Sequence, residues 1–196
     1  MAAPTILVTG ASGFVGRRLC AAIRTAMPNA QIVRADRTGD VDAELDITNA
    51  DAVNALVARA APTTLFHLAA IAAVSTATNN PAAAWAINRD GAGNVMRAAL
   101  QHAPDCHFIF VSTAEVYGAS FAAGLPVAES APLRPLSEYA KTKAAAEDLL
   151  QDYVVRGLFA TTIRPFNHTG PGQTTEFVIP AFASQIAECE RGLRAP

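Results

Sequence analysis

Charged side chains are scarce in this sequence, and neither sign predominates. Only 16% of the 196 residues are charged, and the formal net charge is -2. A protein that binds nucleic acid or an anionic membrane through its surface charge needs an excess of basic residues, which this chain lacks. Apolar stretches are interrupted by Arg, Asp, Asn or Pro before they reach the roughly 20 residues that span a bilayer. We therefore expect neither a nucleic-acid partner nor a membrane span.

Cysteine is scarce as well, and Cys20, Cys106 and Cys189 lie far apart without forming a CxxC pair. Such spacing predicts buried or free thiols in a reducing compartment, and no metal site follows from it. The amino-terminal residues lack the basic region of a signal peptide and lead directly into a strand-like segment. These features predict a cytoplasmic protein.

Apolar residues are plentiful, at 51%, and short β-branched runs alternate with longer helical patterns. Each run is almost wholly apolar, as parallel strands covered on both faces are. The expected strands are 5–10, 30–35, 64–68, 107–112 and 160–165, and the expected helices are 14–26, 49–59, 82–102 and 137–155. This alternation predicts an α/β fold of the Rossmann type, a doubly wound parallel sheet with helices on both faces.

Two segments break the alternation. Residues 119–136 contain three prolines and predict a surface loop over the carboxyl ends of the strands, where open α/β sheets bind ligands. Residues from 165 onward are irregular again, and an apolar pattern at helical spacing follows from residue 178.

A glycine-rich segment, VTGASGFVG, lies between the first expected strand and the first expected helix. Gly10 permits a tight turn, Gly13 lets the backbone approach a pyrophosphate, and Gly16 lets helix and strand pack closely. The N–H groups at the start of the helix then attract the phosphate charge. We therefore expect a bound dinucleotide whose contacts in this loop are Gly10, Ser12, Gly13, Phe14, Val15 and Gly16.

The end of the second expected strand bears on which dinucleotide binds. Asp36 stands twenty residues after Gly16, where a carboxylate would bind the adenosine ribose hydroxyls and favour NAD. Arg37 could instead meet the 2′-phosphate of NADP, so the choice between NAD and NADP stays open. Asp46 and Ile47 are expected near the adenine, although Asp46 would equally suit a cap of the next helix.

Tyr139 and Lys143 are four residues apart in a predicted helix and so share one face. A tyrosine with its ordinary pKa of about 10 is a weak base at neutral pH unless a cation stabilises its phenolate, and Lys143 is placed to do so. Thr113, beside Ser112 at the end of the strand at 107–112, offers a hydroxyl for the substrate oxygen. The spacing alone would suit a solvated helix face, but together with the glycine loop it predicts catalysis.

Six motifs, in order along the chain, now carry a family resemblance: TGASGFVG, FHLAA, AINRDG, STAEVYG, YAKTK and RPFNHTGPGQ. They resemble the extended short-chain dehydrogenase/reductase family, the NAD(P)-dependent nucleotide-sugar epimerases, dehydratases and reductases. By this resemblance Tyr139 exchanges the proton, Lys143 also holds the nicotinamide ribose, and Thr113 binds the reacting oxygen. Asn88 matches the asparagine that supports the lysine through water. The resemblance adds further cofactor contacts: Leu68, Ala69, Ala70, Pro165 and Phe166.

The segment from residue 164 to residue 192 is similar to that of GDP-4-dehydro-6-deoxy-D-mannose reductases, and Asn167 matches their substrate-contacting asparagine. Nucleotide-sugar 4,6-dehydratases resemble this chain but carry an aspartic acid where Ala114 stands, and alanine cannot donate the proton that loss of water requires. Glu115 is expected to bind substrate or only to anchor a loop. The resemblance thus implies reduction of the 4-keto group of a GDP-linked deoxy sugar, with 4-epimerisation as the alternative.

Members of this family have longer chains, on the order of 300 residues. We therefore expect an NAD(P)-binding Rossmann domain at 1–165 and the beginning of an incomplete substrate-binding domain at 166–196, in a chain truncated at its carboxyl terminus. The alternative from another class is a dinucleotide-binding module with little catalysis. Dimers of the family pair through helices that match 82–102 and 137–155, so the resemblance also implies a homodimer.

Overall fold

The computed structural model describes residues 3–195, apart from the side chain of Ala123. The chain divides into two compact units, the first ending at Phe166 and the second beginning at Asn167. Each unit is described by itself.

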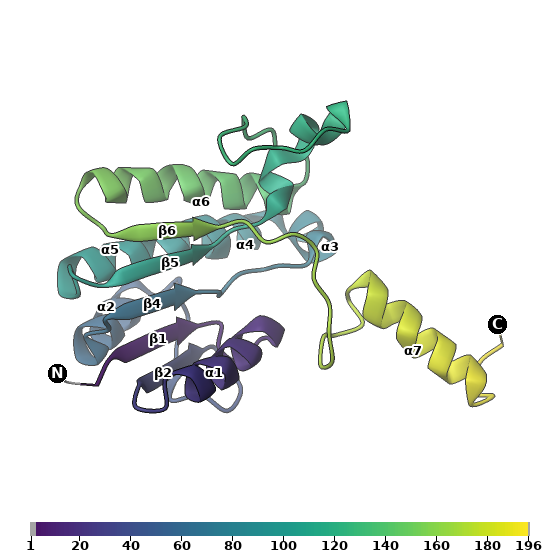
Figure 1. Cartoon of the computed structure of the whole chain (residues 1–196), viewed down its shortest axis with the longest axis horizontal. Coiled ribbons are helices and arrows are strands. Elements are labelled where there is room, and N and C mark those ends of the chain that lie inside the picture. Colours follow the sequence, from purple (N-terminus) through teal and green to yellow (C-terminus); the bar gives the residue numbers. More distant parts are fainter. Residues whose placement is uncertain (1–2, 196) are drawn as a thin grey trace. The chain divides into compact units, whose positions relative to one another are not determined.

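A six-stranded parallel sheet forms the centre of the first unit, in the order β3-β2-β1-β4-β5-β6 (Figure 1). The strands are β1 (Thr5–Thr9), β2 (Gln31–Asp36), β3 (Ala43–Glu44), β4 (Thr64–His67), β5 (His107–Val111) and β6 (Ala160–Ile163). The order reverses between β1 and β4, so a switch point lies at their carboxyl ends, where open sheets of this type bind ligands. The predicted Rossmann-type fold is confirmed; the two-residue β3 and the short helix Val74–Asn79 were missed.

Helices lie on both faces of this sheet (Figure 1). They are α1 (Phe14–Ala26), α2 (Ala50–Ala60), α3 (Val74–Asn79), α4 (Pro81–Trp85), α5 (Ala92–His102) and α6 (Glu138–Val155). The predictions at 14–26, 49–59 and 137–155 agree to within one residue. The helix predicted at 82–102 is instead α4 and α5 joined by a π-helical turn, Ala86–Gly91.

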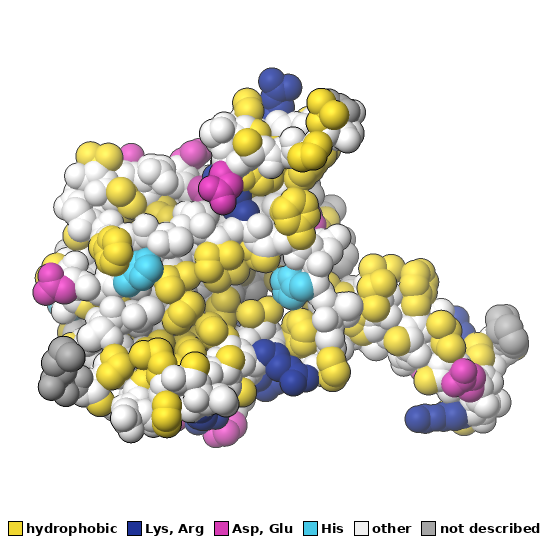
Figure 2. All heavy atoms as spheres, in the orientation of Figure 1, with side chains coloured by type: hydrophobic (Ala, Val, Ile, Leu, Met, Phe, Trp, Pro, Cys, Tyr) yellow, Lys and Arg dark blue, Asp and Glu magenta, His cyan; other side chains and the backbone are white. Residues whose placement is uncertain are grey.

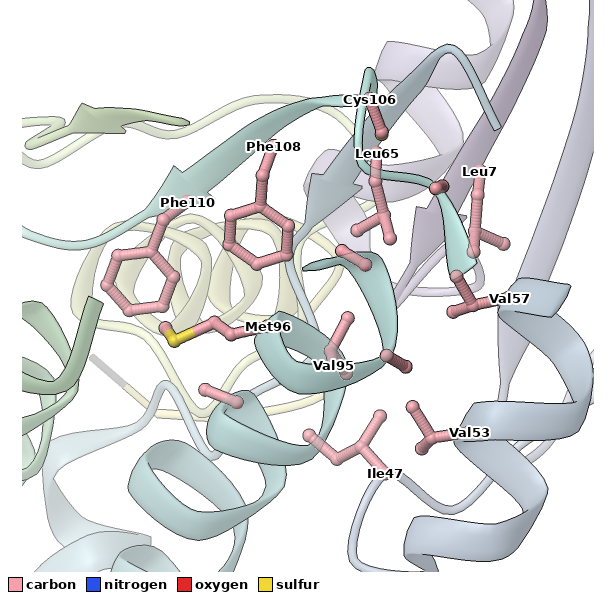
Figure 3. Close-up of a cluster of buried hydrophobic side chains, with 14 of the residues drawn as sticks. Leu7, Ile47, Val53, Val57, Leu65, Val95, Met96, Cys106, Phe108 and Phe110 are labelled. Carbon is pink, nitrogen blue, oxygen red and sulfur yellow. The ribbon is translucent and has the colours of Figure 1, made fainter. Parts of the chain in front are cut away.

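The main hydrophobic core lies between the sheet and the helices α2, α5 and α6. Figure 3 shows part of this cluster, in which Leu7, Leu65, Phe108 and Phe110 from the strands meet Val53, Val57, Val95 and Met96 from α2 and α5. Burying each such side chain stabilises the fold by about 1.5–3 kcal/mol. On the opposite face, α1 packs Cys20 and Ile23 against β1. The core therefore fixes the strands whose carboxyl ends carry the candidate site.

The face opposite α5 and α6 is less covered over β5 and β6. Phe159 and Ile163 are 60% and 43% exposed there. Figure 2 shows hydrophobic side chains gathered over this part of the sheet.

The segment predicted as a loop at 119–136 begins inside a 3₁₀ helix, Ala114–Ala123, and is irregular only from Gly124 onward. Gly118 interrupts this helix with a φ of +43°, and a Cβ there would overlap the carbonyl group of Arg134. The close contact between Gly118 and Arg134 cannot be predicted from the pattern of apolar residues. The segment lies beyond the carboxyl ends of β5 and β6, as predicted (Figure 1).

The second unit consists of an irregular stretch followed by α7 (Val178–Glu190). The helical spacing predicted from residue 178 is therefore confirmed. Four of its large apolar side chains are more than half exposed: Val178, Ile179, Phe182 and Ile186.

Candidate functional site

The glycine loop joins β1 to α1 and brings backbone very close to backbone. Gly10 has a φ of +71°, and a Cβ there would lie 2.7 Å from the amide nitrogen of Ala69. A Cβ on Gly16 would overlap the carbonyl oxygen of Gly10 and the backbone of Ala11. Gly13 is the N-cap of α1 and therefore adds no side chain in front of the first helical turn. The loop thus has no space for a Cβ at Gly10 or Gly16 and no side chain in front of the first turn of α1. This shape fits a pyrophosphate group.

Asp36, at the end of β2, is tied to the glycine loop. Its Oδ2 accepts hydrogen bonds from the amide nitrogen of Ser12 at 3.1 Å and from the hydroxyl of Ser12 at 2.7 Å. Its Oδ1 accepts one from the amide nitrogen of Arg37 at 2.8 Å, and the Arg37 side chain is exposed. The structure therefore brings the predicted carboxylate and loop together, with a cation available beside them.

Asp46 and Ile47 lie just before α2. Asp46 accepts hydrogen bonds from the amide and hydroxyl of Thr48 at 2.9 and 2.7 Å, which lower its pKa. The helix itself is capped by Asn49, whose side chain accepts from the amide of Ala52. Asp46 therefore closes the preceding turn, while the Ile47 side chain is buried in the core and leaves only backbone for the adenine.

Leu68, Ala69 and Ala70 follow β4 and border the glycine loop. The amide of Leu68 donates to the carbonyl oxygen of Thr9 at 3.2 Å, and that of Ala69 to the Thr9 hydroxyl at 3.5 Å. The segment is half-buried. It therefore forms one wall of the switch point between β1 and β4.

Asn88 lies in the π-helical turn and is buried. Its Oδ1 accepts from the amide of Ile71 at 2.8 Å, and its Nδ2 donates to the carbonyl oxygen of Ile71 at 3.1 Å and to the hydroxyl of Thr142 at 3.0 Å. These bonds tie the segment after β4 to α6, one residue before Lys143. These direct bonds reach the residue before Lys143, while support of Lys143 itself through water stays a prediction; π-helical turns are frequent at functional sites.

Thr113 and Tyr139 meet at the carboxyl end of β5. Thr113 caps the 3₁₀ helix, where its hydroxyl accepts from the amide of Glu115 at 3.2 Å. Burial raises the pKa of Tyr139 to about 12, although a hydrogen bond with the Thr113 side chain opposes that rise, and the Glu115 charge adds to it. The raised pKa keeps Tyr139 a protonated phenol at neutral pH, the form that can donate a proton, and stabilisation of its phenolate by Lys143 stays a prediction.

Lys143 is only 2% exposed. Its Nζ lies 4.2 Å from the centre of the Phe110 ring. Burial lowers the pKa of Lys143 to about 7, and the charge of Glu147 opposes this. Within residues 3–195 its ammonium group has no side-chain hydrogen bond, which is costly for a buried cation. The hydroxyls of a nicotinamide ribose are acceptors that would satisfy it, so Lys143 fits the expected cofactor.

Glu115, predicted to bind substrate or anchor a loop, accepts a hydrogen bond from the hydroxyl of Ser137 at 3.2 Å. Ser137 in turn caps α6 by accepting from the amide of Ala140 at 3.1 Å. Glu115 therefore helps to hold the start of the helix that carries Tyr139. A substrate contact for Glu115 stays a prediction.

Pro165 and Phe166 follow β6. The carbonyl oxygen of Pro165 accepts from the amide of Ala114 at 2.9 Å, which joins this segment to the 3₁₀ helix. Phe166 is 66% exposed, and its ring lies edge-on to that of Phe121 with centroids 6.0 Å apart. Asn167 is exposed and begins the second unit, so its substrate contact stays a prediction.

Two buried groups near Lys143 were missed from the sequence. Glu147 is buried against the guanidinium of Arg164, and His67 lies with its Nδ1 2.8 Å from the Thr9 hydroxyl. Burial lowers the pKa of His67 to about 3, so its ring is neutral. Glu147 stands four residues after Lys143, so the spacing that linked Tyr139 to Lys143 already indicated its face.

The structure also describes the three cysteines, the groups that could bind a metal ion and the helices that could span a membrane. Cys20 and Cys106 are buried free thiols and Cys189 is half-buried. Residues 3–195 contain no cluster of His, Cys, Asp and Glu suited to a metal ion. No helix among them has both the length and the apolar character of a membrane span.

Comparison with known proteins places this site in a family. A sequence model described as the NAD dependent epimerase/dehydratase family matches residues 6–194. The GDP-6-deoxy-D-mannose reductase of Pseudomonas aeruginosa is 35% identical over 97% of this chain and 60% of its own length. Curated relatives also include UDP-glucose 4-epimerases and dTDP-glucose 4,6-dehydratases.

Two solved structures resemble this fold. RMD from Pseudomonas aeruginosa complexed with NADPH matches with a TM-score of 0.85 and 34% identity, over 98% of this chain and 62% of that one. UDP-glucose 4-epimerase from Thermus thermophilus in complex with NAD matches with a TM-score of 0.86 and 26% identity, over 94% and 63%. These structures and the family description agree with the cofactor class expected from the sequence.

The chain thus spans about 60% of the length of the first curated relatives that it matches. The family match over residues 6–194 includes the glycine loop, the Tyr139–Lys143 helix and the segment after β6. The predicted family resemblance is confirmed: the chain belongs to the NAD dependent epimerase/dehydratase family.

Proposed function

We propose that this chain binds NAD or NADP at the carboxyl edge of its sheet and reduces the 4-keto group of a nucleotide-linked deoxy sugar of the GDP-4-keto-6-deoxymannose type. The observation that carries this is that the Tyr139 phenol, whose pKa is influenced by the adjacent Thr113 side chain, shares a helix face with the buried Lys143. The similarity to a GDP-6-deoxy-D-mannose reductase supports the substrate class.

The residues divide the work between binding and proton transfer. The glycine loop would hold the pyrophosphate, Asp36 or Arg37 the adenosine ribose, and Lys143 the nicotinamide ribose. When bound, the dinucleotide supplies the hydride. Tyr139 donates its phenolic proton to the keto oxygen as that oxygen gains negative charge. The Thr113 hydroxyl binds the same oxygen and holds it in line with Tyr139.

Reduction is favoured over dehydration by Ala114. Its side chain is a buried methyl group, so this position has no acidic group that could donate the proton required for dehydration. Epimerisation at C4 is the alternative within the family, because the same tyrosine and hydride steps serve it, and UDP-glucose 4-epimerases are among the relatives.

The chain covers only part of the length of its relatives, and this supports a second candidate function. Since the chain spans about 60% of those proteins, it can also be a dinucleotide-binding module with little catalysis. We infer that residues 166–196, including Asn167, begin a substrate-binding region in the active form. Pairing through α5 and α6 as a homodimer belongs to the same proposal.

Binding and turnover measured together test this function. Purified chain is mixed with NADPH or NADH, and cofactor fluorescence reports binding before a GDP-4-keto-6-deoxy sugar is added. Tyr139→Phe should keep binding but reduce turnover by about 10²–10⁴-fold. Tyr153→Phe, on the same helix but in the core, is the matched control and should turn over normally. Binding without turnover in the unaltered chain would favour the module, and no binding would refute both.

A further inference from the structure

A buried ion pair lies one helical turn beyond Lys143. The Nε of Arg164 lies 3.1 Å from each carboxylate oxygen of Glu147, and its Nη2 lies 2.6 Å from Oε2. The two side chains are 23% and 5% exposed. A two-pronged contact of this kind is among the stronger side-chain hydrogen-bond arrangements and fixes the geometry of both groups.

The helix α6 places Glu147 on the face that carries the proposed catalytic residues. Tyr139, Lys143 and Glu147 follow one another in steps of four, so their side chains lie in one row. A glutamate four residues after a lysine would ordinarily pair with it directly. Here both Glu147 oxygens are engaged by Arg164, and within the described residues none accepts a hydrogen bond from Lys143.

Arg164 is itself held by the segment that carries Thr113. Its Nη1 donates to the hydroxyl of Tyr117 at 2.7 Å and to the carbonyl oxygen of Glu129 at 2.9 Å. Its Cζ lies 5.0 Å from the centre of the Tyr117 ring. Because Tyr117 belongs to the 3₁₀ helix that Thr113 caps, the guanidinium is fixed relative to both Thr113 and α6.

We propose that Glu147 and Arg164 are positioning residues for Lys143: Glu147 favours the ammonium form through space, and Arg164 occupies the carboxylate so that the ammonium does not bind Glu147 and stays available to the cofactor. The inference rests on the function proposed for Lys143. It assigns a role in the reaction to two residues that bind neither substrate nor cofactor.

The charges around Lys143 determine whether each variant should raise or lower its pKa. Glu147 is the carboxylate whose charge opposes the effect of burial on the Lys143 pKa. Burial and the charge of Lys143 lower the pKa of His67, from β4, so its ring is neutral and adds no charge beside Lys143, and Tyr139 is a phenol at neutral pH. Removing Glu147 should therefore lower the pKa of Lys143 further. Removing Arg164 should raise it, because a cation is lost and the freed carboxylate can bind the ammonium directly.

The composition of the chain makes this measurable without activity. Lys141 and Lys143 are its only lysines, so a chain labelled with ¹³C-lysine gives two ε-carbon signals in an NMR titration. A Lys141→Arg variant assigns them. We expect Glu147→Gln to lower the Lys143 midpoint by about one pH unit and Arg164→Gln to raise it by about as much. Asp148→Asn, which removes an exposed carboxylate from the adjacent position, is the control and should leave it unchanged.

Shifts of opposite sign would support the proposal, whereas unchanged midpoints or two shifts of the same sign in folded variants would overturn it. Should either single variant unfold, the double variant Glu147→Gln with Arg164→Gln replaces the ion pair by two amides. In the double variant the Lys143 midpoint should lie below that of the unaltered chain, because Glu147 is the nearer charge. A Lys143 midpoint at or above that of the unaltered chain would overturn the proposal.

Cofactor binding separates this inference from the proposed function. Arg164→Gln should weaken NADH or NADPH binding roughly tenfold, since the ammonium turns toward Glu147. An unaltered chain that binds neither cofactor would refute the proposed function, while the titration would still decide the inference. Full cofactor affinity in Arg164→Gln would show that Arg164 does not direct the ammonium.

Discussion

The two ends of the proposed cofactor site are built in different ways. The adenosine end, formed by the glycine loop and Asp36, depends on backbone shape: a Cβ at Gly10 would lie 2.7 Å from Ala69. The nicotinamide end, formed by Tyr139 and Lys143, depends on burial, which raises the pKa of one and lowers that of the other. The adenosine end therefore depends on positions where no side chain fits, which leave space for the ligand. The nicotinamide end depends on which of its two side chains carries a proton.

The largest expected effect is at the adenosine end. Gly10→Ala should weaken dinucleotide binding at least about a hundredfold and cost about 2–4 kcal/mol of stability, because the methyl group meets the backbone of Ala69. Gly124→Ala is the matched control: Gly124 has a φ of +64° against +71° for Gly10, but nothing lies within 4 Å of its added Cβ. Titration with NADH or NADPH and urea unfolding measure the difference.

Gly124→Ala should lose only about 1 kcal/mol, the cost of a left-handed backbone for alanine, and keep full binding. Equal losses in the two variants would mean that backbone conformation alone, rather than close approach, makes Gly10 necessary. The adenosine end would then not differ from an ordinary βα turn.

At the nicotinamide end, the expected signature is a dependence of stability on pH. The folded pKa of Lys143, about 7, lies below its ordinary value of 10.5, so the unfolded chain binds more protons between these values. The free energy of unfolding should therefore rise with pH above about 7, by up to about 1.4 kcal/mol per pH unit. The rise should end near pH 9, where Cys20 and Cys106, whose folded pKa values are raised by burial, begin to ionise in the unfolded chain.

Lys143→Met provides the control, because it keeps the buried volume but removes the charge. Urea unfolding between pH 7 and pH 9 should show a slope in the unaltered chain and little slope in this variant. His67, whose folded pKa is also lowered, should still give both chains a rise below pH 6.5. A slope of the same size in Lys143→Met would assign the dependence to other groups.

A smaller loss of stability is expected where Asn88 joins the two segments beside Lys143. Asn88→Ala leaves the backbone groups of Ile71 and the hydroxyl of Thr142 without these bonds, so it should cost about 1–3 kcal/mol. Asn54→Ala, on α2, removes no side-chain hydrogen bond among the described residues and should change stability by less than about 0.5 kcal/mol. Similar losses in both would show that the Asn88 bonds contribute little.

The same comparison explains what could be predicted from the sequence. The glycine loop and Asp36 belong to one strand–helix–strand unit, in which a spacing of about twenty residues between the last glycine and the carboxylate is a known rule. The strands were predictable because buried parallel strands are nearly all apolar. The two-residue β3 was missed because it is too short to form a pattern, and the π-helical turn because it is a local deviation within one long helical pattern.

The protonation of the nicotinamide end could not be predicted in this way. The spacing of Tyr139 and Lys143 indicated which residues share a face, but their pKa values follow from burial by segments distant in the sequence. Arg164 pairs with the carboxylate of Glu147, seventeen residues away, and donates to the backbone carbonyl oxygen of Glu129, thirty-five residues away. Contacts of this kind exist only after the sheet and α6 have packed.

The smallest expected effect is again at the adenosine end and concerns the choice between NAD and NADP. A carboxylate at Asp36 binds ribose hydroxyls and repels a 2′-phosphate, so Asp36→Asn should shift the ratio of NADPH to NADH affinity toward NADPH by about tenfold. Asp40→Asn, in the following loop and paired with Arg34, is the control and should leave the ratio unchanged. If Asp36→Asn weakens both cofactors equally, the carboxylate serves mainly to hold Ser12, and Arg37 becomes the residue that sets the preference.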